Sequence, residues 1–115
     1  MTGRLTTHVL DTARGTPGAG VAIELLFLEG NNFVHLKSEK TNRDGRTDRP
    51  LLEGDGFRNG TYQLMFHMGE YFRAQGLAAG FVDVVPVRFG IADRMQHYHV
   101  PLLCSPWSYS TYRGS

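Results

Sequence analysis

The chain lacks the residues and runs on which several classes of protein depend. It has one cysteine, Cys104, in 115 residues, which excludes an intramolecular disulfide and a cysteine-rich metal site. It has no run of lysine or arginine, and its formal net charge is only +1, so we expect no nucleic-acid partner. No apolar stretch approaches the roughly 20 residues that cross a membrane, so we expect no membrane partner either.

Several sequence signatures of enzymes and of export are also missing. The chain has no Gly-x-Ser-x-Gly, no His-Glu-x-x-His and no Gly-x-x-x-x-Gly-Lys, which argues against a serine nucleophile elbow, a zinc protease motif and a phosphate loop. Residues 1–11 lack the apolar segment of a secretory signal. We therefore expect a cytoplasmic protein, or a periplasmic one if a signal peptide has been removed.

The residues that are present suit one folded domain over residues 1–115. Hydrophobic residues make up 41% of the chain and charged residues 20%, which is typical of globular proteins. A chain of this length buries one core and is too short for two.

Six segments have the composition or the two-residue alternation of β-strands, and Gly, Pro, Asn and Asp residues separate them. The expected strands cover residues 5–10, 21–27, 33–41, 62–68, 81–89 and 98–104. The segment 70–75 contains helix formers and is followed by Gly76, so it predicts one short helix. These features together predict an all-β fold, an antiparallel β-sandwich, although the pattern alone leaves a barrel open.

Two details predict local geometry. Residues 42–45, Asn-Arg-Asp-Gly, predict a turn in which Gly45 has a positive φ, with Arg46 at the start of the next strand. Pro86 and Pro101 each remove a backbone N–H from a strand, so the two strands should lie at sheet edges or carry bulges.

The five histidines are the first candidates for chemistry, because imidazole exchanges protons near neutral pH. His97 and His99 lie two residues apart and should share one face of a strand, while His8 should share a face with Thr6 on another strand. Three imidazoles could therefore converge. A zinc site is a competing interpretation, since two strand histidines and a third from elsewhere can hold a metal.

The C-terminal segment is rich in aromatic and hydroxyl side chains. Seven of the eleven residues in 105–115 carry a hydroxyl, and Trp107 lies among them. A polar terminus is often frayed. However, Trp107, Tyr109 and Tyr112 are costly to leave in water, so we expect this segment to pack against the domain as part of an active site.

Four segments together resemble a known family, the transthyretin-related 5-hydroxyisourate hydrolases. They are residues 5–11 (LTTHVLD), 42–46 (NRDGR), 97–103 (HYHVPLL) and 110–115 (STYRGS). The resemblance covers nearly the whole chain, and the terminal Tyr-Arg-Gly-Ser separates these hydrolases from transthyretin itself. Trp107 and Ser108 stand where the family pattern has an aromatic residue and a glycine, which predicts a somewhat different bend of the tail.

The resemblance implies a fold, an assembly and a reaction. The fold is a transthyretin-like sandwich of two four-stranded sheets with a short helix, and the assembly is a homotetramer with active sites at the dimer–dimer interface. The substrate is a small molecule, 5-hydroxyisourate, whose cyclic amide is hydrolysed to 2-oxo-4-hydroxy-4-carboxy-5-ureidoimidazoline during urate degradation. The resemblance implies neither a metal nor another cofactor.

The resemblance also assigns candidate site residues. The catalytic candidates are His8, Arg46 and His99, of which His8 and Arg46 would also bind substrate, and the further substrate-binding candidates are Tyr112, Ser115, His97 and Arg113. One histidine would act as general base on water, and arginine would stabilise developing negative charge. The alternative is a transthyretin-like small-molecule binding protein without catalysis, although a lining of His and Arg favours a polar ligand over an apolar one.

Overall fold

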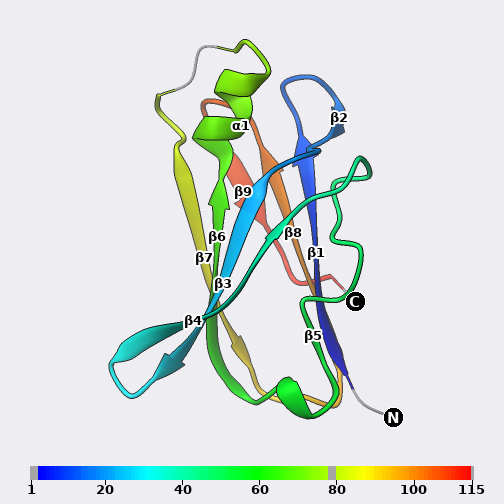
Figure 1. Cartoon of the computed structure of the whole chain (residues 1–115), viewed down its shortest axis with the longest axis vertical. Coiled ribbons are helices and arrows are strands. Elements are labelled where there is room, and N and C mark those ends of the chain that lie inside the picture. The colour runs from blue at the N-terminus through cyan, green and yellow to red at the C-terminus, as the bar shows by residue number, and fades with distance from the viewer. Residues whose placement is uncertain (1–2, 78–79, 115) are drawn as a thin grey trace.

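The computed structural model describes residues 3–77 and 80–114. Most of the described chain is β-strand, and there is one α-helix and one short 3-10 helix (Figure 1). In chain order the elements are β1 (Arg4–Asp11), β2 (Thr16–Pro17), β3 (Ala22–Glu29), β4 (Asn32–Lys40), β5 (Leu52–Glu53), η1 (Gly54–Gly56), β6 (Gly60–His67), α1 (Met68–Ala74), β7 (Val84–Ile91), β8 (His97–Cys104) and β9 (Tyr109–Thr111).

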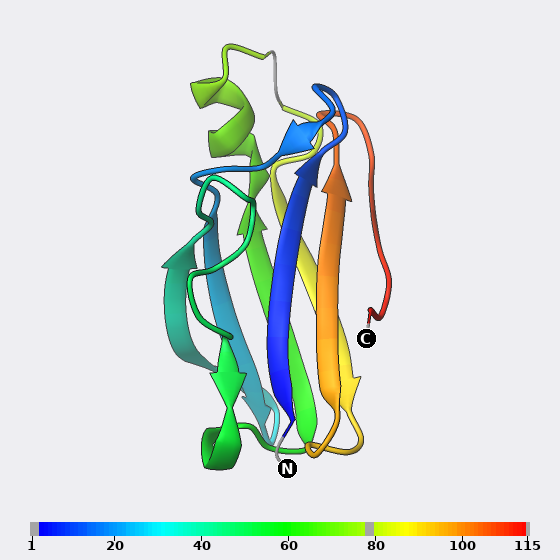
Figure 2. The same ribbon diagram turned by 90° about the vertical axis from the view of Figure 1, so that its right-hand side faces the viewer.

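Two sheets pack face to face, which confirms the expected β-sandwich. One sheet has the order β2-β1-β8-β9, with β5 paired to the start of β1, and the other has the order β4-β3-β6-β7. Figure 2 shows β1 and β8 side by side in front of β6 and β7, with α1 at one end of the sandwich. The pairings are antiparallel except that of β1 with β8, which is parallel over all eight residues of both strands.

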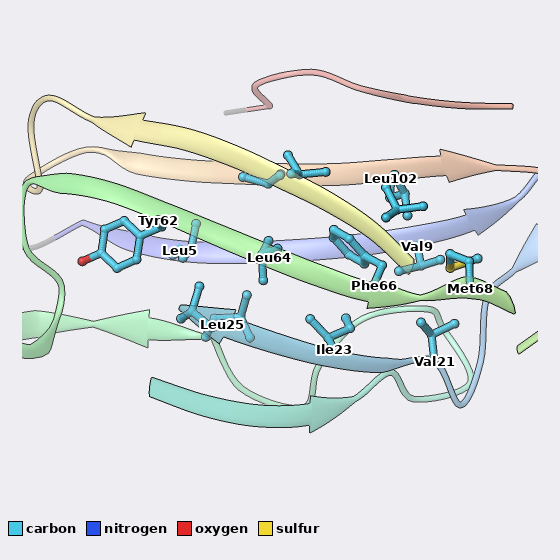
Figure 3. Packing of buried hydrophobic residues seen from close by; sticks show 14 of the residues in the cluster. Leu5, Val9, Val21, Ile23, Leu25, Tyr62, Leu64, Phe66, Met68 and Leu102 are labelled. Carbon is cyan, nitrogen blue, oxygen red and sulfur yellow. The ribbon is translucent and has the colours of Figure 1, made fainter. Parts of the chain in front are cut away.

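Alternation along each strand supplies the core between the sheets. Val21, Ile23, Leu25 and Phe27 point inward from β3 and the residue before it, and each is less than a tenth exposed. Figure 3 shows Val21, Ile23 and Leu25 in the layer between the sheets, with labelled residues of β6 and β1. Burying a side chain of this size contributes about 1.5–3 kcal/mol, so the two-residue period fixes which face of every long strand turns away from the core.

Two predicted boundaries differ from the structure for reasons outside the local pattern. Met68 was predicted to end a strand, but it begins α1, because the backbone N–H groups of Met68 and Gly69 both donate to the carbonyl oxygen of Asp83 at 3.1 and 3.0 Å. The strand predicted from Phe81 begins at Val84 instead, and the Phe81 side chain is 74% exposed.

The prediction from the two prolines was right for one strand and wrong for the other. β7, which contains Pro86, pairs with β6 alone within the described residues, so it is an edge strand. β8, which contains Pro101, is instead an inner strand between β1 and β9. The proline is tolerated there because β9 pairs only with Leu102–Cys104, so no ladder bond from β9 requires an N–H at position 101.

Candidate functional site

The outer face of the β1–β8 pair brings together side chains from the two ends of the chain. The parallel register places Arg4 opposite His97 and Thr6 opposite His99. Residues two apart on a strand share a face, so His8 lies on this face next to Thr6. The expected convergence of the three imidazoles on one face is therefore seen, and the His8 and His99 ring centroids are 6.5 Å apart.

The turn after β4 carries Arg46 to the same place. The Asn42 side-chain oxygen accepts hydrogen bonds from the backbone N–H groups of Asp44, at 2.9 Å, and Arg46, at 3.2 Å. Gly45 has the predicted positive φ, 78°, which a residue with a side chain rarely adopts. A Cβ on Gly45 would also collide with the carbonyl oxygen of Val9, so only glycine fits this contact between turn and β1.

Arg46 does not begin a regular strand, which corrects the sequence prediction. It forms a single antiparallel bridge with His8, and the next strand, β5, begins six residues later. The turn is closed by the Asn42 side chain and by a hydrogen bond from the Asn42 N–H to the Arg46 carbonyl oxygen. The chain leaves β1 directly after the bridge.

A single hydrogen bond selects the tautomer of neutral His8. Its Nε2 lies 2.9 Å from the backbone carbonyl oxygen of Asp44. A carbonyl oxygen only accepts, so Nε2 must carry the proton, and Nδ1 is left as the nitrogen able to take one.

His97 and His99 are joined by one hydroxyl. The Thr6 Oγ1 lies 3.0 Å from His97 Nε2 and 2.8 Å from His99 Nδ1. The alternation of the sequence predicted that Thr6 would share the face of His8, but it did not assign Thr6 a role. Finding this contact requires the register of two strands that lie more than 90 residues apart, and alternation alone does not fix a register.

The surroundings of His8, His97 and His99 favour the neutral form of each ring, because they lower its pKa. Burial lowers the pKa of His8 below its ordinary 6.5, and the nearby charge of Arg46 lowers it further, against a smaller opposing effect of Asp44. Burial also lowers the pKa of His99, followed by Arg46 and the other two imidazoles. The pKa of His97 is lowered by burial, then by the charges of Arg4 and Arg113. Neutral imidazoles near pH 7 are able to accept protons.

The C-terminal segment lies along β8, so its backbone is paired and not frayed. β9 pairs antiparallel with the end of β8, and further on Gly114 and His99 exchange backbone hydrogen bonds of 2.7 and 3.3 Å. A Cβ on Gly114 would lie 2.8 Å from His99 Cδ2. Between these two pairings the ladder is interrupted at Pro101, whose carbonyl oxygen accepts from the Thr111 hydroxyl at 2.7 Å.

The aromatic side chains of this segment do not pack into the domain, contrary to the prediction from their cost in water. Trp107 is 70% exposed, Tyr112 60% and Tyr109 48%. The nearest aromatic partner of Trp107 is the exposed Phe81, with ring centroids 6.5 Å apart. The tail is thus held by its backbone, while its large side chains remain open to another surface.

Of the remaining tail candidates, Arg113 contacts the backbone of the histidine cluster, because it donates to the carbonyl oxygen of His97 at 3.3 Å. The Arg113 guanidinium stacks 4.1 Å from the Tyr98 ring centroid and donates to the Gln96 side chain at 2.9 Å. Tyr112 and Arg113 both line a pocket of about 260 Å³ between the tail and β7. Ser115 lies outside the described residues.

The other two histidines lie on the second sheet. Glu24 on β3 accepts a hydrogen bond from His67 at 2.6 Å and lies 3.9 Å from His35. Glu24 and His67 border an open groove of about 500 Å³, which is also lined by Glu39 and Glu70. Over residues 3–77 and 80–114, no three His, Cys, Asp or Glu side chains come together as a group able to hold a metal ion. No described helix is long and apolar enough to cross a membrane.

Comparison with known proteins adds a family to this geometry. The model of the HIUase/Transthyretin family matches residues 5–114. The curated "5-hydroxyisourate hydrolase 2" of Rhizobium meliloti (strain 1021) is 58% identical, covering 98% of this chain and 97% of the relative. The "5-hydroxyisourate hydrolase" of Ralstonia nicotianae is 57% identical, covering 98% and 99%.

Solved structures share the fold closely. An (S)-allantoin synthase structure superposes with a TM-score of 0.94 at 45% identity, covering 99% of this chain but only 44% of that one. Klebsiella pneumoniae 5-hydroxyisourate hydrolase gives 0.82 at 33% identity, covering 98% and 94%. Sea bream transthyretin in complex with thyroxine gives 0.89 at 27% identity, covering 96% and 94%. The sandwich is therefore transthyretin-like, as expected.

Proposed function

The chain belongs to the HIUase/Transthyretin family, and from that premise we propose that it is an enzyme that hydrolyses 5-hydroxyisourate. Water opens a cyclic amide of the substrate, and the product is 2-oxo-4-hydroxy-4-carboxy-5-ureidoimidazoline, a step of purine catabolism. The observation that carries the proposal is the meeting of His8, Arg46 and His99 on one face of the β1–β8 pair. Attack of water on an amide requires a base and a group that stabilises negative charge, and these side chains supply both.

A neutral histidine removes the proton from the attacking water. His8 and His99 both suit this role, because burial and the Arg46 charge lower the pKa of each below 6.5. A positioned base contributes roughly 10²- to 10⁴-fold in rate. His8 would accept the proton on Nδ1, since Nε2 already donates to the Asp44 carbonyl.

Arg46 stabilises the oxygen that becomes negative as the amide carbonyl is attacked. Its backbone is fixed to His8 by the bridge and to Asn42 by the closed turn, so the guanidinium begins from a defined point beside the base. A preorganised cation or hydrogen-bond donor aimed at a developing oxyanion lowers the barrier to acyl transfer.

The tail orients the flat, polar substrate. Gly114 packs against the His99 ring, so this part of the tail lies at the rim of the site. Tyr112 and Ser115 would position substrate through hydroxyl groups, and His97 and Arg113 would add further polar contacts.

A second subunit completes each site in a homotetramer. The pocket beside Thr6 and Arg46 has a volume of about 150 Å³ and is lined by neither His8 nor His99, whereas pockets that enclose a ligand measure about 300–1,000 Å³. The exposed tail aromatics border the same sheet. Placing sites between two dimers would deepen the pocket and cover these rings.

The deciding experiment generates 5-hydroxyisourate with urate oxidase and follows its ultraviolet decay with and without the protein. We expect decay well above the spontaneous rate, unchanged by EDTA. Decay at the spontaneous rate would contradict the proposal and would favour a transthyretin-like binding protein. Lost activity in EDTA, restored by zinc, would favour a metal site at the histidines.

A further inference from the structure

We propose that Thr6 is a positioning residue that sets the tautomer of His99 and links it to His97. Thr6 is not among the residues assigned to the site above, and the inference rests on the proposed hydrolase function. It follows from two distances, 2.8 Å from Thr6 Oγ1 to His99 Nδ1 and 3.0 Å from the same oxygen to His97 Nε2.

A hydroxyl has one proton to donate and two lone pairs that accept, so Thr6 can donate to only one of the two rings. When the Thr6 hydroxyl donates to one neutral imidazole, its contact with the other ring requires an N–H donated by that ring. The proton on one ring then determines the proton on the other. Two complementary arrangements of this kind are possible, and they differ in whether Nε2 of His99 carries a proton.

The chemistry selects between these arrangements. Nδ1 of His99 is occupied by Thr6, so only Nε2 remains to take a proton from water. Nε2 is basic only if Nδ1 carries the ring proton. In that arrangement His99 Nδ1–H donates to Thr6 Oγ1, and the Thr6 hydroxyl donates to an unprotonated His97 Nε2. When Nε2 of His99 accepts a proton, the Nδ1–H bond to Thr6 strengthens, since its donor is then charged.

The fold holds this hydroxyl in place. Thr6 lies directly opposite His99 in the parallel register, and His97 lies two residues earlier on the same strand, so Oγ1 reaches both rings. Threonine is branched at Cβ, which restricts its side-chain rotation. The next residue, Thr7, makes a comparable contact on the core side, where its hydroxyl donates to the Val100 carbonyl oxygen at 2.7 Å.

The test compares Thr6→Val, Thr6→Ser and Thr7→Val. Thr6→Val keeps the shape and removes the hydroxyl, and we expect kcat to fall about tenfold with KM little changed, as for one lost hydrogen bond in the transition state. Thr6→Ser should restore most of the rate. Thr7→Val removes a hydroxyl bond between the same strands without touching a histidine, and kcat should stay at the wild-type value. A wild-type kcat in Thr6→Val would overturn the proposal.

A second measurement needs no substrate and no variant. Nitrogen-15 chemical shifts of the imidazole rings in the intact wild-type protein near pH 8 distinguish the two neutral tautomers. We expect His99 to be protonated on Nδ1 and His97 to be unprotonated on Nε2. The reverse pattern would refute the role of Thr6 even if the enzyme hydrolyses 5-hydroxyisourate. Failure of hydrolysis would remove the proposed function while leaving the tautomers measurable.

Discussion

Each of the two candidate bases has one ring nitrogen committed to a hydrogen bond. His8 uses Nε2 for the Asp44 carbonyl, and His99 uses Nδ1 for the Thr6 hydroxyl. The committed nitrogens are therefore opposite in the two rings. The two residues are fixed by different neighbours, so replacing one leaves the orientation of the other intact.

Alanine at either position should reduce turnover without unfolding the protein. We expect His8→Ala and His99→Ala each to lower kcat by at least about tenfold, because a positioned base contributes roughly 10² to 10⁴. Both side chains lie on the outer face of the sheet and not in the core, so the melting temperature should change little. Steady-state kinetics with circular dichroism melting would check this, and full activity in both variants would refute the assignment.

The pH dependence of kcat/KM should depend on the charge of Arg46. The lowered pKa of His8 and His99 keeps both neutral down to a pH below 6.5, so activity should persist through neutral pH and fall as the pH drops past that lower pKa. Arg46→Gln removes one cause of the lowering, and the acid limb should move up toward 6.5. Burial remains, so it should not pass 6.5.

Arg88→Gln is the matched control for this profile. Arg88 lies on β7 of the other sheet, where it donates to Gln63 and stacks over Phe33, so its loss should leave the acid limb in place. An acid limb that stays in place or moves to lower pH in Arg46→Gln would show that the arginine does not hold the base neutral.

At the scale of elements, the Asn42–Arg46 turn requires glycine at position 45 for two reasons, its positive φ and the lack of room for a Cβ. Gly45 and Gly20 share a φ of 78°, but only at Gly45 would a Cβ meet other atoms. Gly45→Ala should therefore destabilise the protein more than Gly20→Ala, in which the strain of about 1 kcal/mol comes from φ alone. Urea unfolding of both variants measures the difference, and equal losses would contradict the close packing of the turn on β1.

The tail is the second element on which the site depends. Deleting residues 112–115 removes the Gly114 pairing with His99 and the proposed substrate contacts, so we expect activity to fall at least about tenfold. β9 would remain paired with β8, and Trp107 and Tyr109 would remain exposed, so we expect the assembly to survive the loss of Tyr112. Kinetics with size-exclusion chromatography would test both expectations. Intact activity in the truncated protein would separate the tail from the site.

The local sequence pattern predicted most elements, but it did not predict features that depend on contacts between residues far apart in the chain. Alternation identified the inward face of β3 and the shared face of His97 and His99, because a period of two is a local property. It did not reveal that α1 begins at Met68, which depends on the Asp83 carbonyl, or that β8 is an inner strand. The role of Thr6 was equally out of reach, since it depends on strand register.

At the scale of the whole molecule, the exposed aromatic side chains point to an assembly. Phe81, Tyr109 and Tyr112 accompany Trp107 on the surface, and exposed apolar groups of this size gather at interaction sites. The cost of leaving these rings in water was recognised from the sequence, but the expected partner within the same domain was wrong. A surface supplied by another subunit is invisible to any pattern within one chain.

We expect sedimentation to give a species close to four times the 12.9 kDa chain. Because assembly stabilises the folded state by mass action, the melting temperature should rise with protein concentration. Trp107→Glu should weaken the assembly, whereas Val34→Glu, a change at an exposed position on β4, should not. A concentration-independent monomer would contradict the proposed tetramer.

The parallel pairing of β1 with β8 also determines when this protein becomes active during its synthesis. The strands that carry His8 and His99 are the first and the last long strands of the chain. Pairing β1 with β8 closes a loop of most of the chain, which is slow because the loss of entropy precedes the stabilising contacts. On the ribosome β1 lacks its neighbour until β8 has emerged, so a translation product that ends before β8 has neither His97 nor His99. The unpaired edge of β1 is the place where a chaperone is most useful.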